Sequence, residues 1–285
     1  MAHYGTFATP GASYGRPRPH RPPARPDGPG PACAADSRHR YRRDGLKAGI
    51  LDHDGAVVAG PDRIATPHPS GPSVIISTLA QLVAPLGSFD RISVGFPGVV
   101  RGGRVLTAPN LGTDVWHAYP LAADLEQRLG KPTRMLNDAS VQGLGVINDV
   151  GLECVITLGT GFGFALFQDG LLAPHLEMGQ HPAAKDKTYD LYLGDAALKK
   201  IGRSKWNKRL AKAIGFLETL ITYDTLLIGG GNAHAIDIDL PPNVRLVSNA
   251  AGITGGLKLW SKKMEPVFAG APCSEPAGAA APAGA

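Results

Sequence analysis

The stretch "CVITLGTGFGFALFQDGLL", residues 154–172, constrains the fold more than any other part of the sequence. Apolar residues flank a glycine-rich segment at 159–163, and an Asp-Gly pair follows at 169–170. Glycine and Asp-Gly supply the positive φ angles that tight β-connections need. The stretch therefore predicts a strand, a glycine turn, a second strand, a tight turn and a third strand.

A similar pattern occurs earlier, where "LKAGILD", "DG" and "AVVAG" predict a hairpin over residues 46–60. Strand-like and helix-like segments then alternate along the chain, with predicted helices at about 73–86 and 121–129 and buried strands at 91–96 and 133–136. This alternation is typical of an α/β protein. Two halves that each begin with a glycine-punctuated hairpin suggest a duplicated fold with a cleft between two lobes, although no exact repeat proves it.

The charge of the chain is unevenly distributed. Residues 1–44 contain eight Arg, eight Pro, no Lys and three acids, which accounts for the whole net charge of +5. Such a segment lacks the apolar residues that offset chain entropy, so we expect a disordered tail over 1–44. We expect an N-terminal α/β lobe over 45–137, a C-terminal α/β lobe over 138–265 and a second disordered tail, rich in Ala, Gly and Pro, over 266–285.

Three distant cysteines fit neither a disulfide framework nor a zinc cluster, so no metal-ligating residues are predicted. The sequence also contains no apolar segment of membrane-spanning length and no secretory leader. We therefore expect a soluble cytoplasmic protein that does not bind a membrane.

Two motifs indicate chemistry. The turn with Gly159, Thr160, Gly161 and Gly163 would let backbone amides converge on a phosphate, although a glycine-rich hairpin is more often only a turn. In "MLNDA", Asp138 follows a strand and begins a helix, at the sheet edge where ligands of α/β proteins collect. The simpler alternative is that Asp138 only caps that helix.

A basic segment precedes the last predicted strand. Seven Lys or Arg lie between Lys199 and Lys212 with no acid among them, and Trp206, Leu210, Ala213, Ile214 and Leu217 form an apolar face at helical spacing. Lys205, Arg209 and Lys212 share another face. This face is either an ordinary solvated surface, which we favour, or a track for the chain anion polyphosphate.

Seven motifs in this order and spacing resemble the ROK family of sugar kinases, especially bacterial glucokinases and polyphosphate glucokinases. The resemblance extends from Leu46 to Trp260 and rests on the following segments: "GFPGVV", "APNLGTDVW", "MLNDA", "ITLGTGFGFALFQDG", "EMGQHP", "LIGGGNA" and "NAAGITGG". It implies the duplicated actin-like ATPase fold, related to ribonuclease H, with two lobes and a central cleft.

The resemblance also implies a kinase that phosphorylates the 6-hydroxyl of glucose, a small-molecule substrate, with ATP or polyphosphate as donor and Mg²⁺ as cofactor. It implies a homodimer without a nucleic-acid partner, and a role for each matched residue. Asp138 matches the catalytic base, and Lys47 matches the lysine that follows the first phosphate loop. The remaining matches are sugar ligands (Asn110, Asn137, Glu177), the second phosphate loop (Gly159, Thr160, Gly161, Gly163) and the adenosine-side turn (Gly229, Gly230, Gly231).

This sequence departs from the family pattern in three places. Gln180 stands where the family has a histidine and can donate to a sugar hydroxyl, and His181 follows it as a substitute sugar ligand. The family's cysteine-rich zinc motif is absent. Finally, the first strand and its Asp-x-Gly-Gly-Thr phosphate loop are missing before Lys47, and "HRYRRD", residues 39–44, stands in their place.

The missing motif is present in a neighbouring reading frame. The string His-Arg-Tyr-Arg-Arg-Asp-Gly can be encoded so that a one-base shift spells Ile-Asp-Ile-Gly-Gly-Thr. We hypothesise a frameshift near Gly45, with residues 1–44 as out-of-frame translation of a GC-rich gene. Resequencing that finds no one-base discrepancy would remove this idea in favour of a natural extension that binds an acidic partner.

Two other functions remain open at this level. Without its first phosphate loop, the chain could be a catalytically impaired sugar-binding relative. The family also contains sugar-responsive transcriptional regulators, but these carry an N-terminal winged helix that a proline-rich tail cannot form.

Overall fold

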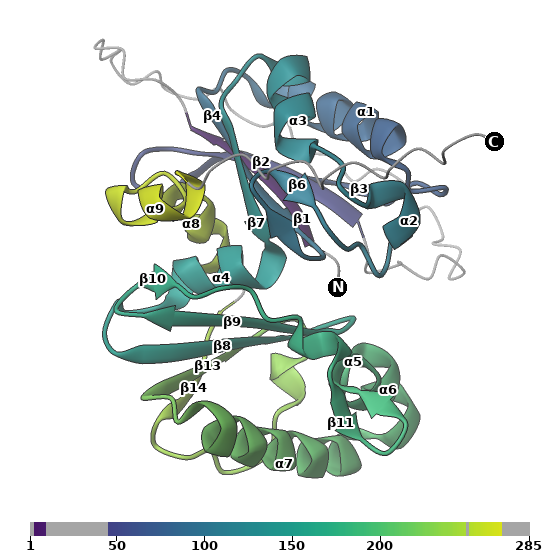
Figure 1. Ribbon diagram of the computed structural model, residues 1–285, viewed down its shortest axis with the longest axis vertical. Helices are drawn as coiled ribbons and strands as arrows, with labels where there is room; N and C mark the ends of the chain where they lie inside the picture. The colour runs from purple at the N-terminus through teal and green to yellow at the C-terminus, as the bar shows by residue number, and fades with distance from the viewer. Residues whose placement is uncertain (1–2, 10–44, 249–250, 270–285) are drawn as a thin grey trace, which may run out of the picture.

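The computed structural model describes residues 3–9, 45–248 and 251–269. Of the tails predicted over 1–44 and 266–285, residues 1–2, 10–44 and 270–285 lie outside the described residues. Asn249 and Ala250 of the last ROK-like motif lie outside them too. The described chain forms two lobes, each built on a five-stranded sheet, with one helix lying between the sheets (Figure 1). The duplicated two-lobed α/β architecture predicted from the sequence is confirmed.

The N-terminal sheet has the strand order β3-β2-β1-β4-β7. Its strands are β1 (His3–Thr9), β2 (Gly45–Leu51), β3 (Val57–Ala65), β4 (Arg91–Phe96) and β7 (Thr133–Asn137). The lobe also contains α1 (Pro72–Val83), η1 (Ala84–Leu86), the ribbon of β5 (Val100–Arg101) and β6 (Arg104–Val105), α2 (Thr113–Trp116) and α3 (Leu121–Leu129). The helix predicted at 73–86 ends in a 3-10 turn that contains Pro85, which cannot donate the hydrogen bond that an α-helix requires.

The C-terminal sheet has the order β10-β9-β8-β13-β14. Its strands are β8 (Leu152–Leu158), β9 (Phe162–Gln168), β10 (Leu171–Leu172), β13 (Thr225–Gly229) and β14 (Val244–Leu246). Around it lie η2 (Met178–Gln180), β11 (Pro182–Ala184), β12 (Lys187–Thr188), α5 (Tyr189–Leu193), α6 (Asp195–Ile201), α7 (Arg203–Ile221) and η3 (Ala233–Ala235). The predicted strand-turn-strand-turn-strand stretch is confirmed as β8, β9 and β10. The predicted apolar face of α7 is also confirmed, since all five of its residues are buried.

Residues 3–9 correct one expectation. We expected the whole of 1–44 to be disordered and the first strand to be missing, but His3–Thr9 forms β1 and pairs with both β2 and β4. An empty position between β2 and β4 would leave both strands with unpaired backbone groups in the middle of a sheet. A segment that contains Tyr4, Thr6, Phe7 and Thr9 has the β-propensity to fill it.

The direction of β1 differs from that of its counterpart in the other lobe. In the C-terminal sheet the central strand β8 runs antiparallel to β9 and parallel to β13. In the N-terminal sheet the central strand β1 runs parallel to β2 and antiparallel to β4. Parallel neighbours cannot be joined by a tight hairpin, so β1 and β2 do not form a glycine turn like the one between β8 and β9.

The C-terminal helices pack on the N-terminal sheet. The elements concerned are α8 (Ala251–Lys258), η4 (Lys262–Met264) and α9 (Glu265–Phe268), so the expected tail over 266–285 begins with a helical turn. The Ser93 hydroxyl of β4 donates to the carbonyl oxygen of Gly256 at 2.6 Å, and Trp260 Nε1 donates to Ser93 Oγ at 2.9 Å. Arg134 of β7 binds both Glu265 carboxylate oxygens and stacks on Trp260 and Phe268. Residues expected in the C-terminal lobe thus contact the N-terminal one.

The central helix α4 (Asp138–Val146) packs closely against α8 (Figure 1). A Cβ atom added at Gly255 of α8 would lie 1.8 Å from the Val141 carbonyl oxygen and 2.9 Å from the Gly145 nitrogen, both in α4. These backbones therefore touch at a point where no side chain fits, and the contact joins the end of the chain to the helix between the lobes.

We predict that Gly255→Ala destabilises the protein by about 1–3 kcal/mol, because the added methyl group forces the two helix backbones apart. Gly215→Ala in α7 is the matched control, since a Cβ there meets nothing within 4 Å. The control should stabilise the protein by about 0.5–1 kcal/mol through helix propensity. Urea denaturation of both variants measures the difference. Equal midpoints would show that the α4–α8 contact is loose.

Candidate active site

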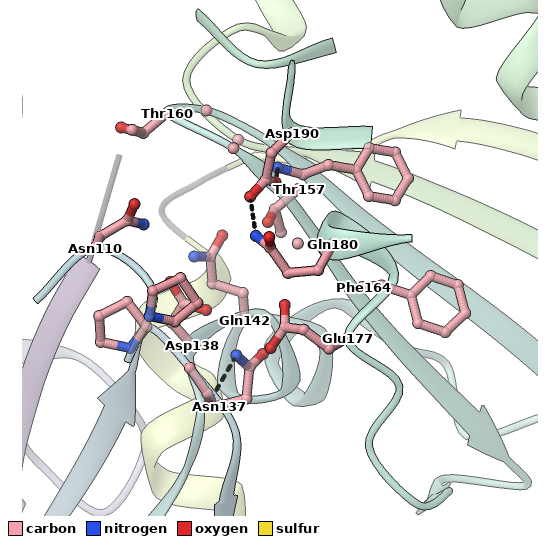
Figure 2. A pocket seen from close by; sticks show the side chains of 18 of the residues that line it. Asn110, Asn137, Asp138, Gln142, Thr157, Thr160, Phe164, Glu177, Gln180 and Asp190 are labelled. Carbon is pink, nitrogen blue, oxygen red and sulfur yellow. Dashed lines mark hydrogen bonds between the residues drawn. The ribbon is translucent and has the colours of Figure 1, made fainter. Parts of the chain in front are cut away.

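A pocket lies between the two lobes (Figure 2). The N-terminal lobe contributes the ends of β4 and β7 and the loop around Asn110, and the C-terminal lobe contributes the β8–β9 turn and the segment before α5. The polar residues among its lining are Asn110, Asn137, Asp138, Gln142, Thr157, Thr160, His175, Glu177, Gln180 and Asp190. The pocket therefore has the polar character expected for a ligand with many hydroxyl or phosphate groups.

Asp138 is positioned by the junction of β7 and α4. The buried Asn137 side chain is the N-cap of α4, since its Oδ1 accepts hydrogen bonds from the amides of Ala139 (2.9 Å) and Ser140 (3.3 Å). Its Nδ2 donates to the Gly98 carbonyl oxygen at 3.1 Å. Asn137 therefore fixes the start of the helix and the neighbouring loop together, and the next residue projects into the pocket.

The surroundings of Asp138 favour the neutral form of its carboxyl group and so raise its pKa. Burial, together with the smaller effect of the nearby Glu177 carboxylate, raises the pKa of its carboxyl group to about 7, while the hydrogen bond from the Ala139 amide opposes the shift. The ordinary value is 3.8. A carboxyl group that titrates close to neutrality can accept a proton from a substrate at physiological pH. The capping role that we considered for this position is carried by Asn137 instead.

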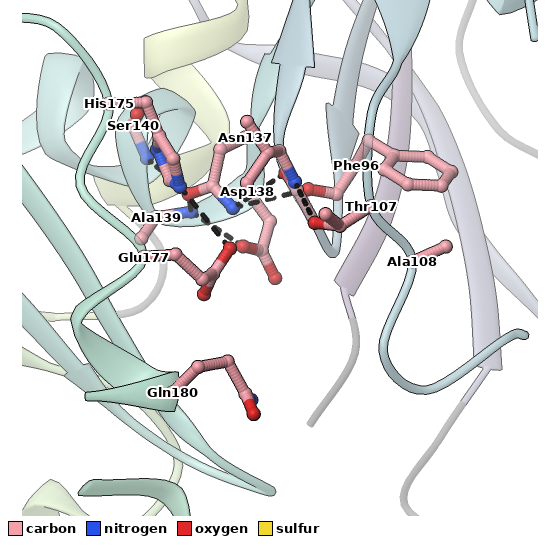
Figure 3. A network of polar contacts seen from close by, with 12 residues as sticks. Phe96, Thr107, Ala108, Asn137, Asp138, Ala139, Ser140, His175, Glu177 and Gln180 are labelled. Atoms are coloured by element: carbon pink, nitrogen blue, oxygen red, sulfur yellow. Dashed lines mark hydrogen bonds and ion pairs between the residues drawn. The ribbon is translucent and has the colours of Figure 1, made fainter. Parts of the chain in front are cut away.

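Glu177 lies beside Asp138 and pairs with a histidine (Figure 3). His175 Nε2 lies 3.3 Å from Glu177 Oε2, and the side chain of His175 is largely buried. Its Nδ1 atom is buried with no hydrogen-bond partner in the described part of the chain. The pair holds the Glu177 carboxylate near Asp138, where it can accept hydrogen bonds from a ligand.

The glycine turn forms the opposite wall. Gly159, Thr160, Gly161 and Gly163 all line the pocket, together with Gly230 and Gly231 from the end of β13. The Asn232 side chain donates to the Gly159 carbonyl oxygen at 3.0 Å, and the Asp195 amide at the start of α6 donates to the same atom at 2.8 Å. The turn is thus held from two sides, with its glycines facing the space in front of Asp138.

The structure brings together most of the residues selected from the sequence. Eleven of them line the pocket: Asn110, Asn137, Asp138, Gly159, Thr160, Gly161, Gly163, Glu177, Gln180, Gly230 and Gly231. His181, Gly229 and Lys47 do not. His181 is exposed near the Tyr189 ring. Gly229 ends β13 and pairs with Thr157 of β8, and Lys47 lies in β2 opposite Arg63 of β3. Burial and Arg63 both lower the pKa of Lys47.

Two predicted sugar ligands, Asn137 and Gln180, already use polar atoms in hydrogen bonds within the chain. The donors and acceptors of Asn137 serve the α4 cap and Gly98. Gln180 Nε2 donates one of its two hydrogens to Asp190 Oδ2 at 2.7 Å (Figure 2), so its carbonyl oxygen and its second N–H are left for a hydroxyl group.

Sequence reasoning missed Asp190 and His175. Asp190 follows the N-cap Thr188 by two residues, so the local pattern indicates only a helix start. His175 lies in a segment without periodicity, and only its spacing of two residues from Glu177 links them. Both residues become part of the site through contacts made in the folded chain.

The donor set suits Mg²⁺ only as a partner of bound phosphates. Within the described ranges, no group of three or more His, Cys, Asp or Glu side chains could hold a metal ion. Mg²⁺ commonly takes one or two carboxylates and completes its shell with water and substrate phosphates. Asp138 fits such a limited role. The described part of the chain also contains no helix that is long and apolar enough to cross a membrane.

The fold and pocket define a two-lobed protein of the actin-like ATPase class with its site in the interlobe cleft. Residues 43–182 match the model of the ROK family. The polyphosphate glucokinase of Mycobacterium tuberculosis is 30% identical over 243 residues, covering 78% of this chain and 91% of that protein. The Mycobacterium leprae polyphosphate glucokinase is 29% identical over 80% of this chain and 76% of its own length. The chain belongs to the ROK family.

Solved structures agree. The inorganic polyphosphate/ATP-glucomannokinase of Arthrobacter sp. strain KM is 27% identical, with a TM-score of 0.68 over 76% of this chain and 94% of that one. A ROK family glucokinase from Streptomyces griseus, solved with glucose and AMPPNP, is 18% identical with a TM-score of 0.62 over 74% of this chain and 94% of that one. The second likeness concerns the fold alone.

We predict that Asp138→Asn stabilises the protein above pH 7 and that the gain disappears toward pH 4. The unfolded chain ionises Asp138 near pH 3.8, whereas the folded chain does so only near pH 7. Wild-type stability therefore falls as the pH rises from about 4 to about 7, and the Asn variant, which has no carboxyl group at this position, does not lose this stability. Urea midpoints between pH 4 and pH 8 measure the effect. Asp114→Asn, at an exposed acid of α2, is the control, and a pH-independent gain would contradict the assigned pKa.

Proposed function

We propose that this protein is a hexose kinase that transfers a phosphoryl group from polyphosphate or ATP to the 6-hydroxyl of glucose. The observation that carries the proposal is the position of Asp138, a carboxyl group with a pKa of about 7 that faces a glycine-lined turn across the interlobe pocket. The kinase names of the similar sequences support this function and do not favour the catalytically impaired alternative.

Asp138 acts as the general base in this proposal. The sugar O6 atom attacks the terminal phosphorus of the donor, the bond from phosphorus to the bridging oxygen breaks, and Asp138 accepts the hydroxyl proton. Its place in the first turn of α4 partly offsets the burial that raises its pKa to about 7, and the ionised form above that pH accepts this proton. Asn110, Glu177 and the Gln180 carbonyl oxygen are available to other sugar hydroxyls from both walls.

The phosphate side of the site consists of backbone amides. We assign the donor's terminal phosphates to the turn with Gly159, Thr160, Gly161 and Gly163, and the remainder of the donor to Gly230 and Gly231. Mg²⁺ would be held mainly by the donor phosphates, and Asp138 would contact it through a water molecule. The ion would neutralise part of the phosphate charge. The resemblance supports a cytoplasmic homodimer as the working form.

The basic face of α7 offers a route for a long polyphosphate. Arg209 is held in place because its guanidinium stacks on the Tyr192 ring at 4.6 Å and donates to the Tyr192 carbonyl oxygen at 3.1 Å. Lys205 and Lys212 are exposed on the same face. The preceding helix α6 begins against Gly159, so α5 and α6 connect this face to the phosphate turn.

We predict that Asp138→Asn lowers kcat by about 10²–10⁴-fold, because the attacking hydroxyl loses its base. The KM for glucose should change much less. A coupled assay for glucose 6-phosphate, run separately with ATP and with polyphosphate, measures both quantities, and Asp114→Asn should behave as wild type. Full activity in the Asp138 variant would remove Asp138 as the base, and wild-type inactivity with both donors would remove the proposed reaction.

We predict that Lys205→Glu combined with Lys212→Glu raises the KM for polyphosphate about tenfold at low salt and leaves the KM for ATP within twofold. A chain anion binds a row of cations with strong salt dependence, so the effect should shrink as salt increases. Lys262→Glu, an exposed charge reversal on η4, is the control. An equal rise in KM for both donors, or no rise in the KM for polyphosphate, would show that this face of α7 is an ordinary solvated surface.

A further inference from the structure

Asp190 connects the two halves of the pocket wall in the C-terminal lobe (Figure 2). Its Oδ1 accepts a hydrogen bond from the Phe162 amide at 2.6 Å, at the end of the glycine turn. Its Oδ2 accepts one from Gln180 Nε2 at 2.7 Å, in the segment that carries Glu177. One carboxylate therefore holds the turn assigned to phosphate and the segment assigned to sugar.

Both segments are shaped to admit this carboxylate. A Cβ atom at Gly161 would lie 2.5 Å from Asp190 Oδ1, and one at Gly179 would lie 2.7 Å from the same atom. Any other residue at either position would push the carboxylate away. The absence of a side chain at Gly161 and at Gly179 therefore lets the Asp190 carboxylate lie between these two backbone segments.

The backbone of Asp190 is fixed by the same group of contacts. Its carbonyl oxygen accepts from the Gly194 amide at 2.9 Å, and the next amide, that of Asp195, donates to the Gly159 carbonyl oxygen at 2.8 Å. A displacement of the glycine turn would therefore disturb Asp190 through its side chain and through the α5–α6 junction, and the Gln180 side chain would follow.

We propose that Asp190 is a positioning residue that couples occupancy of the sugar side of the pocket to the conformation of the phosphate turn. This inference rests on the proposed function, because it concerns how the sugar and donor halves of that site communicate. A sugar hydroxyl that binds the Gln180 carbonyl oxygen orders the Gln180 amide. The amide then holds Asp190, and Asp190 orients the Phe162 amide and the turn before it.

Kinetics of four variants test the coupling: Asp190→Ala, Asp190→Asn, Gln180→Ala and the double variant Asp190→Ala with Gln180→Ala. Loss of a hydrogen bond to a charged group corresponds to about tenfold in binding. Asp190→Ala should therefore raise the KM for both glucose and donor about tenfold. Gln180→Ala should raise the KM for glucose alone. The double variant should be no worse for glucose than Asp190→Ala.

The Asp190→Asn variant separates positioning from charge. Its side-chain amide can accept from the Phe162 amide and, once the Gln180 amide turns over, donate to the Gln180 carbonyl oxygen. Both KM values should then stay within threefold of wild type. Asp186→Asn, an exposed acid in the β11–β12 turn, is the matched control. A rise in glucose KM alone for Asp190→Ala, or additive effects in the double variant, would overturn the coupling.

Hydrogen exchange at the Phe162 amide tests the same contact without catalysis. Exchange should be at least tenfold faster in Asp190→Ala and unchanged in Asp190→Asn, Gln180→Ala and Asp186→Asn. If wild type transfers no phosphoryl group, the proposed reaction fails, yet this measurement still decides whether Asp190 holds the turn. If Asp190→Ala does not fold, Asp190→Asn decides, because a tenfold rise in either KM, or loss of Phe162 protection, contradicts a role based on hydrogen bonding.

Discussion

The Asn137 cap is the contact on which the site depends. Its side chain satisfies two amides at the start of α4 and one carbonyl oxygen of the loop after β4, so it joins strand, helix and loop at one point. A buried amide with all these partners has little freedom to move. Asp138 takes its position from that rigidity, and α4 in turn lies between the lobes against α8. The geometry of the pocket and the packing of the lobes therefore share one anchor.

Local patterns predicted the elements whose geometry is decided locally. The glycine turn at 159–163, the Asp-Gly turn at 169–170 and the strand-to-helix change at Asn137 each depend on residues within a few positions, and each is present. Asp190 and the return of α8 and α9 to the N-terminal lobe were not predicted. Their roles come from partners such as Gln180 or Ser93 that are separated in sequence, and a single sequence gives no direct signal of such pairings.

The two lobes are alike in strand order but not in strand direction. In the N-terminal sheet β1 occupies the central position but runs parallel to β2, so the two strands form no hairpin. In the C-terminal sheet the hairpin of β8 and β9 brings its glycines to the cleft. The two lobes therefore differ in what precedes β2, and this is also where the sequence lacks the first strand and phosphate loop of the family. A strand supplied there through a tight turn would run antiparallel to β2, as β8 does to β9, and would place a second set of amides at the cleft.

The charge of the pocket makes that difference matter. Its lining contains three carboxylates, those of Asp138, Glu177 and Asp190, and includes no Lys or Arg among the described residues. A phosphate donor adds more negative charge to this set, and like charges repel strongly where water is excluded. Neutralisation must therefore come from backbone amides at the glycine turn, from a cation carried with the donor, and from basic residues outside the pocket. The described residues place one glycine hairpin at the cleft. In the proposed reaction the exposed lysines of α7 and the metal ion would therefore take a larger share of that neutralisation, which would favour a long anion able to reach those lysines over a short one.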